Sequence, residues 1–124
     1  VNHRVVAIRI PQSDAKNLRF EHRTAGADAN PYLVTAAIVA GVHYGLKNKC
    51  DPGTLVEQGA RIVPKLKIPH RWDAAIDKFR RSKILPAYLG GDYCKYFAMN
   101  RREESRRFHN TVSQLDFDWY LRSV

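Results

Sequence analysis

Residues 18–41 read LRFEHRTAGADANPYLVTAAIVAG, and two different periodicities follow one another within this stretch. Its first six side chains alternate in direction, as side chains do along a β-strand. One side of the predicted strand therefore carries a carboxylate between two guanidinium groups: Arg19, Glu21 and Arg23. The second half has apolar or small residues at nearly every position. The stretch predicts a charged strand followed closely by an apolar helix.

The helix is predicted over residues 30–49. Asn30 suits a helix N-cap, and Pro31 suits the first helical position, where a missing backbone N–H costs nothing. Lys47 and Lys49 fit the last turn, since cations are favourable at the C-terminal end of a helix. Because the apolar and small side chains leave no polar face, we expect this helix to be buried.

The strand at residues 18–23 has a predicted partner earlier in the chain. Residues 5–10, VVAIRI, are rich in β-branched side chains, and the PQSDAKN segment that follows contains several turn formers. We therefore expect an antiparallel β-hairpin within residues 1–24. Across this hairpin Arg9 lies beside the charged row that contains Glu21.

The remainder of the chain is predicted to be helical over residues 70–124. A half-buried helix is indicated by four apolar side chains at helical spacing: Trp72, Ala75, Ile76 and Phe79. A short turn or helix should follow through ILPAYLG. The preceding connection, residues 51–68, is poorly patterned and is predicted to be mostly loop.

A last long helix should begin near Asp92 and continue past His109. Its expected anchors are five apolar or aromatic side chains: Tyr93, Tyr96, Phe97, Phe108 and Val112. Glu103 and Arg107 form a favourable i,i+4 pair on this helix. In the tail we expect one more helical turn that docks three apolar side chains: Phe117, Trp119 and Leu121.

The chain is strongly basic. It has 124 residues, with 21 Lys and Arg against 12 Asp and Glu, and a formal net charge of +9. Residues 61–83 hold eight basic residues against two acidic ones. This charge points to anionic partners. It leaves open an alternative interpretation as a small basic helical module that binds nucleic acid, although a run of charge is more often a solvated face.

The cysteines and the apolar runs bear on the location of the protein. Cys50 and Cys94 have no CxxC or zinc-like spacing and fit reduced thiols in a cytoplasm. The longest apolar run, residues 32–42, is too short to span a bilayer, and no secretory leader is visible. We expect a cytoplasmic protein. The chain has no starting methionine and enters a strand almost at once, as if cut from a longer protein.

The charged row on the second strand suggests a binding site for an anionic ligand. The planar fork of arginine binds phosphate and carboxylate through paired hydrogen bonds. A glutamate among such groups could ligate a divalent cation held by phosphate oxygens. Glu21 alone is an incomplete metal site, however, because magnesium and manganese take several oxygen ligands. The alternative is a simple ladder of cross-strand ion pairs without a ligand.

These motifs resemble those of a known family. NHRVVAIRIP followed by LRFEHRTAGADANPYLVTAAIVAG is similar to the C-terminal part of the catalytic domain of the glutamine synthetase family. A looser similarity continues through IPHRWDAAIDKFRRS, LGGDYCKYF and RREESRRFHNTV. GADANPY is more like the branch that joins glutamate to amines or polyamines. The resemblance implies an α+β fold that is mostly helical with an N-terminal antiparallel β-hairpin, as part of a larger catalytic domain.

The resemblance also implies roles for individual residues. The family's reaction is an ATP-dependent ligation in which glutamate is first phosphorylated on its side chain and then attacked by ammonia or an amine. Glu21 resembles a ligand of Mg²⁺ or Mn²⁺ beside the transferring phosphoryl group. Arg4 and Arg23 resemble catalytic arginines at the phosphoryl and substrate side. Arg9 and Arg19 resemble contacts to the ATP phosphates.

Departures from the family pattern limit these expectations. The family's other metal-binding residues, its glycine-rich nucleotide segment and its flap glutamate belong to segments that residues 1–124 do not include. We therefore expect these 124 residues alone to be inactive. Because the resemblance implies a ligase, nucleic acid is not an expected partner. The family forms homo-oligomeric rings, so an alternative role for these residues is assembly without catalysis.

Overall fold

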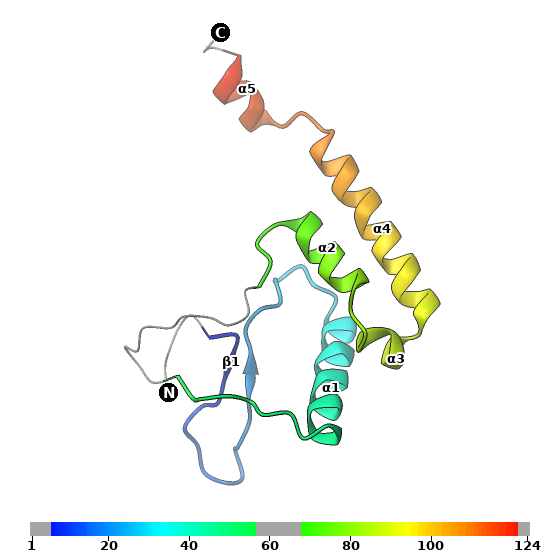
Figure 1. Ribbon diagram of the computed structural model, residues 1–124. Coiled ribbons are helices and arrows are strands. Elements are labelled where there is room, and N and C mark those ends of the chain that lie inside the picture. Colours follow the sequence, from blue (N-terminus) through cyan, green and yellow to red (C-terminus); the bar gives the residue numbers. More distant parts are fainter. Residues whose placement is uncertain (1–5, 57–67, 122–124) are drawn as a thin grey trace. The chain divides into compact units, whose positions relative to one another are not determined.

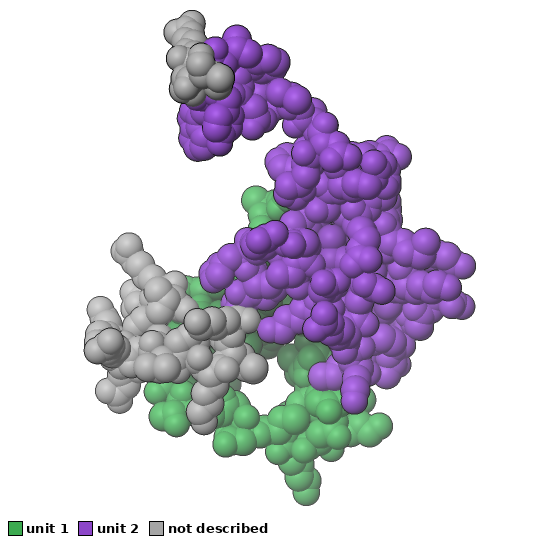
Figure 2. Space-filling view, turned by 45° about the horizontal axis from the view of Figure 1, so that its top comes forward, with its two compact units in different colours: residues 1–67 green, residues 68–124 purple. Residues whose placement is uncertain are grey.

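The computed structural model describes residues 6–56 and 68–121 (Figure 1). The chain divides into two compact units, residues 1–67 and residues 68–124, which Figure 2 colours separately. The described residues form the following elements in chain order: β1 (Ile8–Arg9), β2 (Glu21–His22), α1 (Pro31–Lys47), α2 (Trp72–Arg80), α3 (Leu85–Leu89), α4 (Gly91–His109) and α5 (Gln114–Tyr120). The prediction of a mostly helical α+β chain with an N-terminal antiparallel hairpin is confirmed.

The hairpin has the predicted pairing but shorter strands. Ile8 lies opposite His22 and Arg9 lies opposite Glu21. One further backbone bond, from the Arg23 N–H to the Ala7 carbonyl, extends the ladder at 2.9 Å. The six-residue strands expected from the sequence are wrong, because regular pairing is limited to two residues on each side. Both β1 and β2 are edges of a two-stranded sheet in the described chain, so no third strand holds their ends extended.

Helix α1 begins where the sequence predicts. The Asn30 side chain accepts hydrogen bonds from the N–H groups of Tyr32 at 3.0 Å and Leu33 at 3.3 Å, and Pro31 occupies the first turn. Lys47 is in the last turn, as expected. These local contacts satisfy donors that every helix leaves free at its N-terminus, which is why the start could be predicted from a few residues.

The described chain leaves much of this helix uncovered, so its expected burial, as part of a larger catalytic domain, stays a prediction. Ala40 is the one buried residue of α1, whereas Tyr32 is 84% exposed and Leu46 is 75% exposed. The apolar pattern indicated that a neighbouring layer should cover the helix. Among the described residues no layer covers the helix fully, so several of its large apolar side chains are exposed, including Val39 and Leu46.

The second unit has a small core in which α2 packs on α4. The Phe79 and Phe97 rings lie 5.2 Å apart between their centroids, and Ile76 and Ala98 are buried. The Arg102 guanidinium joins the helices by donating to Asp77 at 2.9 Å. The predicted helix is confirmed, but its buried face is narrower than expected: Ile76 is buried and Phe79 half-buried, whereas Trp72 and Ala75 are exposed.

Helices α3 and α4 meet at a glycine. Gly90 has a φ of +89°, in the left-handed region that favours glycine, and it separates the two helices. Helix α4 ends at His109, so the expected continuation past this residue is wrong. Of its predicted anchors, Phe97 packs inward, while three are largely exposed: Tyr96, Phe108 and Val112.

The tail forms helix α5 through a capping box. The Ser113 side chain accepts from the Asp116 N–H at 3.3 Å, and the Asp116 carboxylate accepts from the Ser113 N–H at 2.8 Å. The expected docking of this helix is wrong, because its predicted contact residues are exposed: Phe117, Trp119 and Leu121. Residues 51–56 are irregular, as expected of a loop, and the rest of that prediction, residues 57–67, lies outside the described residues.

Candidate functional site

The carboxylate of Glu21 is held by two arginines at the hairpin. Arg9 Nη1 donates to both oxygens of this carboxylate, at 2.9 Å and 3.1 Å, from the opposite strand. Arg23 Nη2 lies 3.5 Å from the second oxygen. The predicted alternation therefore brings three of the five candidate residues together. Their side chains are half-buried: 24% exposed for Arg9, 34% for Glu21 and 29% for Arg23.

The surroundings of Glu21 keep it ionised. The hydrogen bond from Arg9 lowers the pKa of the Glu21 carboxyl, and the positive charges of Arg9, Arg23 and Arg19 lower it further, against a smaller opposing effect of burial. A carboxylate that stays negative at neutral pH is the form that binds a divalent cation. The same contacts mean that its oxygens already have cationic partners in this state.

Arg9 has an unused donor. Its Nε atom is buried and has no hydrogen-bond partner in the described chain, while its Nη1 group is engaged by Glu21. A guanidinium presents five N–H donors in a planar fork, and a buried donor without an acceptor is unfavourable.

Arg19, another of the candidate residues, is not brought to the Glu21 carboxylate. Arg19 Nη1 donates to the backbone carbonyl of Asn17 at 3.2 Å, so its guanidinium is engaged at the hairpin loop rather than at Glu21. It acts on Glu21 only as a nearby charge. Arg4 lies outside the described residues. Its predicted role stays a prediction.

The fit to a metal ion is partial. Glu21 is an oxygen donor of the type that Mg²⁺ and Mn²⁺ prefer. Among the described residues no group of three or more His, Cys, Asp or Glu side chains could hold a metal ion. His22, on the other side of β2, contacts Thr24 Oγ1 at 2.8 Å through Nε2. Glu21 by itself is therefore an incomplete metal site, and its role as a metal ligand stays a prediction.

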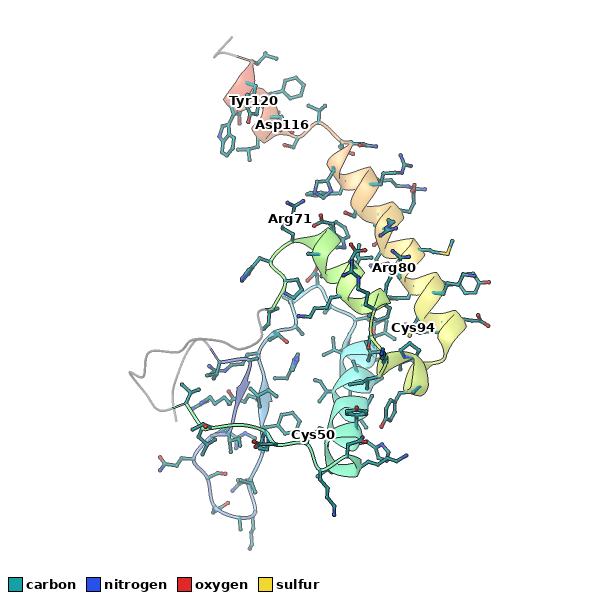
Figure 3. All side chains as sticks on the ribbon, viewed as in Figure 1. Cys50, Arg71, Arg80, Cys94, Asp116 and Tyr120 are labelled. Carbon is teal, nitrogen blue, oxygen red and sulfur yellow. The ribbon has the colours of Figure 1, made fainter. Side chains whose placement is uncertain are left out.

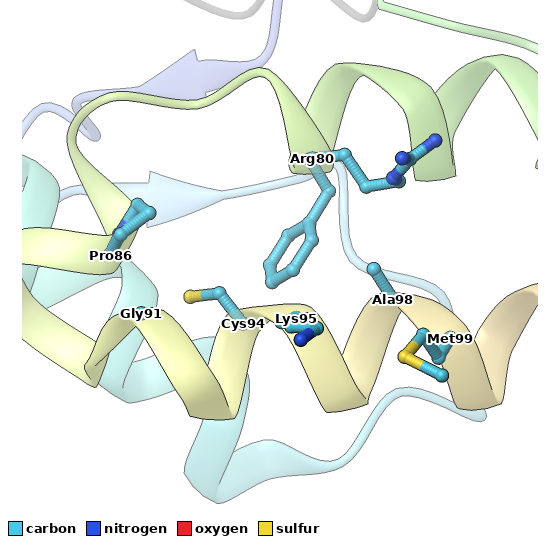
Figure 4. A pocket seen from close by; sticks show the side chains of 8 residues that line it. Arg80, Pro86, Gly91, Cys94, Lys95, Ala98 and Met99 are labelled. Carbon is cyan, nitrogen blue, oxygen red and sulfur yellow. The ribbon is translucent and has the colours of Figure 1, made fainter.

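A separate cavity lies in the second unit, between α2, α3 and α4 (Figure 4). It has a volume of about 320 Å³ and includes Cys94, Lys95 and Arg80 in its lining. Burial raises the pKa of the Cys94 thiol, which makes this cysteine a poor nucleophile. Figure 3 shows Cys94 on α4 and Cys50 in the segment after α1. No motif predicted this cavity, because it depends on how three helices meet.

The basic stretch at residues 61–83 is partly neutralised where it is described. Arg71 pairs with Asp73 at 2.9 Å, and Arg80 lies 3.6 Å from Asp77. Paired charges on an exposed helix are typical of a solvated face rather than a nucleic-acid interface. No helix of the described residues is long and apolar enough to cross a membrane.

Comparisons with known proteins agree with the motifs at the hairpin. The family model described as glutamine synthetase, catalytic domain, matches residues 1–120. The gamma-glutamylputrescine synthetase PuuA of Escherichia coli (strain K12) is 38% identical over 123 residues, which cover 99% of this chain and 26% of that protein.

Two further relatives have different names and lower identities. The type-1 glutamine synthetase 2 of Dictyostelium discoideum is 30% identical over 129 residues, covering 100% of this chain and 25% of that protein. The glutamate–isopropylamine ligase of a Pseudomonas species is 28% identical over 123 residues, covering 97% and 27%. The chain thus spans about a quarter of the length of the relatives it matches.

Proposed function

Because the chain belongs to the glutamine synthetase family, we propose that it is part of an ATP-dependent ligase that joins the side chain of glutamate to ammonia or an amine. The observation that carries this proposal is the Arg9–Glu21–Arg23 cluster on two paired strands. It combines a carboxylate suited to a divalent cation with guanidinium groups suited to phosphate. Phosphoryl transfer depends mainly on positioning and on neutralising charge.

The proposed reaction has two steps. A side-chain carboxylate oxygen of glutamate attacks the γ-phosphorus of ATP, and ADP leaves. The amine nitrogen then attacks the acyl carbon of the γ-glutamyl phosphate, phosphate leaves with the bonding pair, and the nitrogen loses a proton. Arg9 and Arg19 bind the ATP phosphates in this proposal, while Arg4 and Arg23 face the transferred phosphoryl group and glutamate.

The divalent cation, Mg²⁺ or Mn²⁺, would neutralise charge on the phosphates when bound. Glu21 would hold it from one side, and the other ligands come from parts of the protein outside residues 1–124. This division is why we expect residues 1–124 alone to have no ligase activity.

We favour an amine over ammonia as the acceptor. The relative named for putrescine is 38% identical to this chain, whereas the Dictyostelium discoideum glutamine synthetase is 30% identical over a similar length. The GADANPY segment points in the same direction. We further propose that the complete protein is a cytoplasmic homo-oligomer, since the apolar side chains exposed on α1 and α5 suit contacts that residues 6–56 and 68–121 do not provide.

The test is an assay of the complete protein. Phosphate release should require ATP, Mg²⁺ or Mn²⁺, glutamate and an acceptor, and should be faster with putrescine than with ammonia. The product should carry the amine on the side-chain carbonyl of glutamate, as seen by mass spectrometry. Absence of acceptor-dependent phosphate release with ammonia and with a panel of amines would overturn the proposal. Phosphate release by residues 1–124 alone would contradict the expectation of an incomplete site.

A further inference from the structure

We propose that a pocket between α2 and α4 is a binding site for a small neutral molecule with one aromatic ring and one oxygen acceptor, such as an aromatic ketone. The two helices lie side by side in the second unit (Figure 1). Their contact leaves a pocket of about 240 Å³, which we call the α2–α4 pocket. It is distinct from the cavity that includes Cys94 and from the hairpin, so the inference does not depend on the proposed function.

The lining of the α2–α4 pocket is almost entirely apolar. Three aromatic side chains line it: Trp72, Phe79 and Phe97. Ile76 and Ala98, which are 6% and 3% exposed, line it from the core of the unit. Ligand pockets in proteins are mostly lined by hydrophobic and aromatic side chains with a small number of polar groups. An aromatic ring in this pocket would bury apolar area and make stacked or edge contacts with the lining rings.

The volume of the α2–α4 pocket suits a single ring with a short substituent. An apolar cavity of about 150 Å³ is large enough to bind benzene, and this pocket is larger. Water is a poor occupant, because a buried water molecule needs roughly two to four polar partners. The lining side chains other than Arg101 are apolar or aromatic, so an apolar molecule is the favoured occupant.

Arg101 provides the polar contact in this lining. Its Nε atom is buried and has no hydrogen-bond partner in the described chain. Its guanidinium carbon lies 5.3 Å from the centre of the Phe97 ring, which places the group at the aromatic part of the pocket. A buried N–H without an acceptor is unfavourable. A ligand oxygen that accepts a hydrogen bond from Nε would remove this cost.

The ligand is expected to be neutral because the charge of Arg101 already has a partner. Arg101 Nη2 donates to Glu104 Oε1 at 2.6 Å. A ligand carboxylate beside Nε would bring a second negative charge close to Glu104, and the two would repel each other. A carbonyl oxygen accepts from Nε without this repulsion. The pocket should therefore prefer an aromatic ketone to the hydrocarbon of the same shape and to the corresponding acid.

The first experiment compares three probes on the complete protein by fluorine NMR: para-fluoroacetophenone, para-fluoroethylbenzene and para-fluorobenzoate. The ketone should bind about tenfold more tightly than the hydrocarbon, as expected for one hydrogen bond from a charged donor. The benzoate should bind more weakly than the ketone. Absence of ketone binding would overturn the site, and equal binding of ketone and hydrocarbon, or tighter binding of benzoate, would overturn the assigned chemistry.

The second experiment fills the pocket. Ala75 lines it and is exposed on α2, so Ala75→Leu adds volume at the pocket without changing the buried core. It should weaken ketone binding at least about fivefold, because an occupied volume opposes the ligand. Ala74→Leu is the matched control: Ala74 is the exposed neighbour on the same helix and is not among the residues that line the pocket. Equal binding by the two variants would contradict the location of the site.

The third experiment removes the donor. Arg101→Met retains a long apolar side chain next to Phe97, so both uncharged probes should still bind, but the tenfold preference for the ketone should disappear. Arg106→Met is the matched control, because Arg106 also pairs with a glutamate three residues away on α4, Glu103, and does not line the pocket. It should keep the preference. A preference that survives in Arg101→Met would refute the role of Arg101.

Discussion

The two units of this chain differ in what they contain: residues 68–124 hold a packed core, and residues 1–67 hold the charged cluster around Glu21. In residues 68–124 an aromatic and aliphatic core joins α2 to α4, and Ile76 and Ala98 are buried within it. In residues 1–67 the described part has one buried residue in α1 and a two-stranded hairpin, yet it holds the charged cluster around Glu21. The residues suited to ligand binding are therefore placed by the register of the two strands, and the described part of residues 1–67 has no comparable hydrophobic core.

Helices α1 and α4 show the same contrast at the level of single elements. They have 17 and 19 residues, so length does not distinguish them. Helix α4 places one stripe, including Cys94 and Ala98, against its neighbours and carries ion pairs of Glu103 on its exposed part. Helix α1 is apolar or small on all sides and has few partners in this chain. The helix with the more hydrophobic sequence is thus the less buried one.

The largest effect on activity is expected from the loss of the Glu21 carboxylate. We expect Glu21→Gln to lower metal-dependent turnover of the complete protein by on the order of 10²–10³-fold, since it removes a charge that stabilises the transferring group. The melting temperature should change little, because the hairpin has no core to lose. Glu103→Gln is the matched control: Glu103 is also paired with two arginines, Arg106 and Arg107, but lies on α4. It should leave turnover unchanged; equal losses in both variants would contradict the assigned role.

A core substitution should show the reverse pattern. Ile76→Ala is expected to destabilise the second unit by about 2–3 kcal/mol, because it removes buried methylene groups and leaves a cavity. Ile76 is 6% exposed, whereas Val39 on α1 is 60% exposed. Val39→Ala should therefore cost less than about 0.5 kcal/mol in the 124-residue chain. Urea unfolding measures both, and similar losses would show that α1 is as well packed as α2.

The start of α1 offers a smaller and more local test. Asn30→Ala should cost about 1 kcal/mol of helix stability, because the N–H groups of Tyr32 and Leu33 lose their acceptor. Asn30→Asp is the control, since it retains an oxygen acceptor. Amide hydrogen exchange of the first turn reads the effect directly. Protection unchanged in Asn30→Ala would mean that contacts beyond the cap hold the helix start.

The smallest expected effect is the loss of stability on protonation of Glu103 at low pH. Hydrogen bonds from Arg106 and Arg107 lower the pKa of Glu103 to about 2, from an ordinary value of 4.5. Since the pKa is lower in the folded state, the stabilisation is present above pH 4.5 and is lost as the pH falls toward about 2. The difference in melting temperature between wild type and Glu103→Gln should shrink over that range. A difference that stays constant would show that the ion pairs contribute nothing.

Local features were well predicted from the sequence. The cap of α1, the helical spacing in α2, the Glu103–Arg107 pair and the facing of Arg9 and Glu21 each depend on residues that are near in sequence or fixed by strand alternation. The family resemblance came from the same short motifs and is confirmed by the family match. The directions of long side chains were not predictable, since Arg19 donates to Asn17 instead of joining the cluster.

From the sequence alone one could predict the order of the helices, the start of α1, the pairing of the two strands and the charges that face each other. Hydrogen bonding within a turn or a hairpin involves neighbours in the chain, so a short segment contains the information. Three features could be seen only in the tertiary structure. They are which apolar faces are covered, how far the strands extend, and how Arg9 binds Glu21 through Nη1 while its Nε has no partner in the described chain. Those outcomes depend on which surfaces meet in space, and that is settled by packing among distant segments rather than by local pattern.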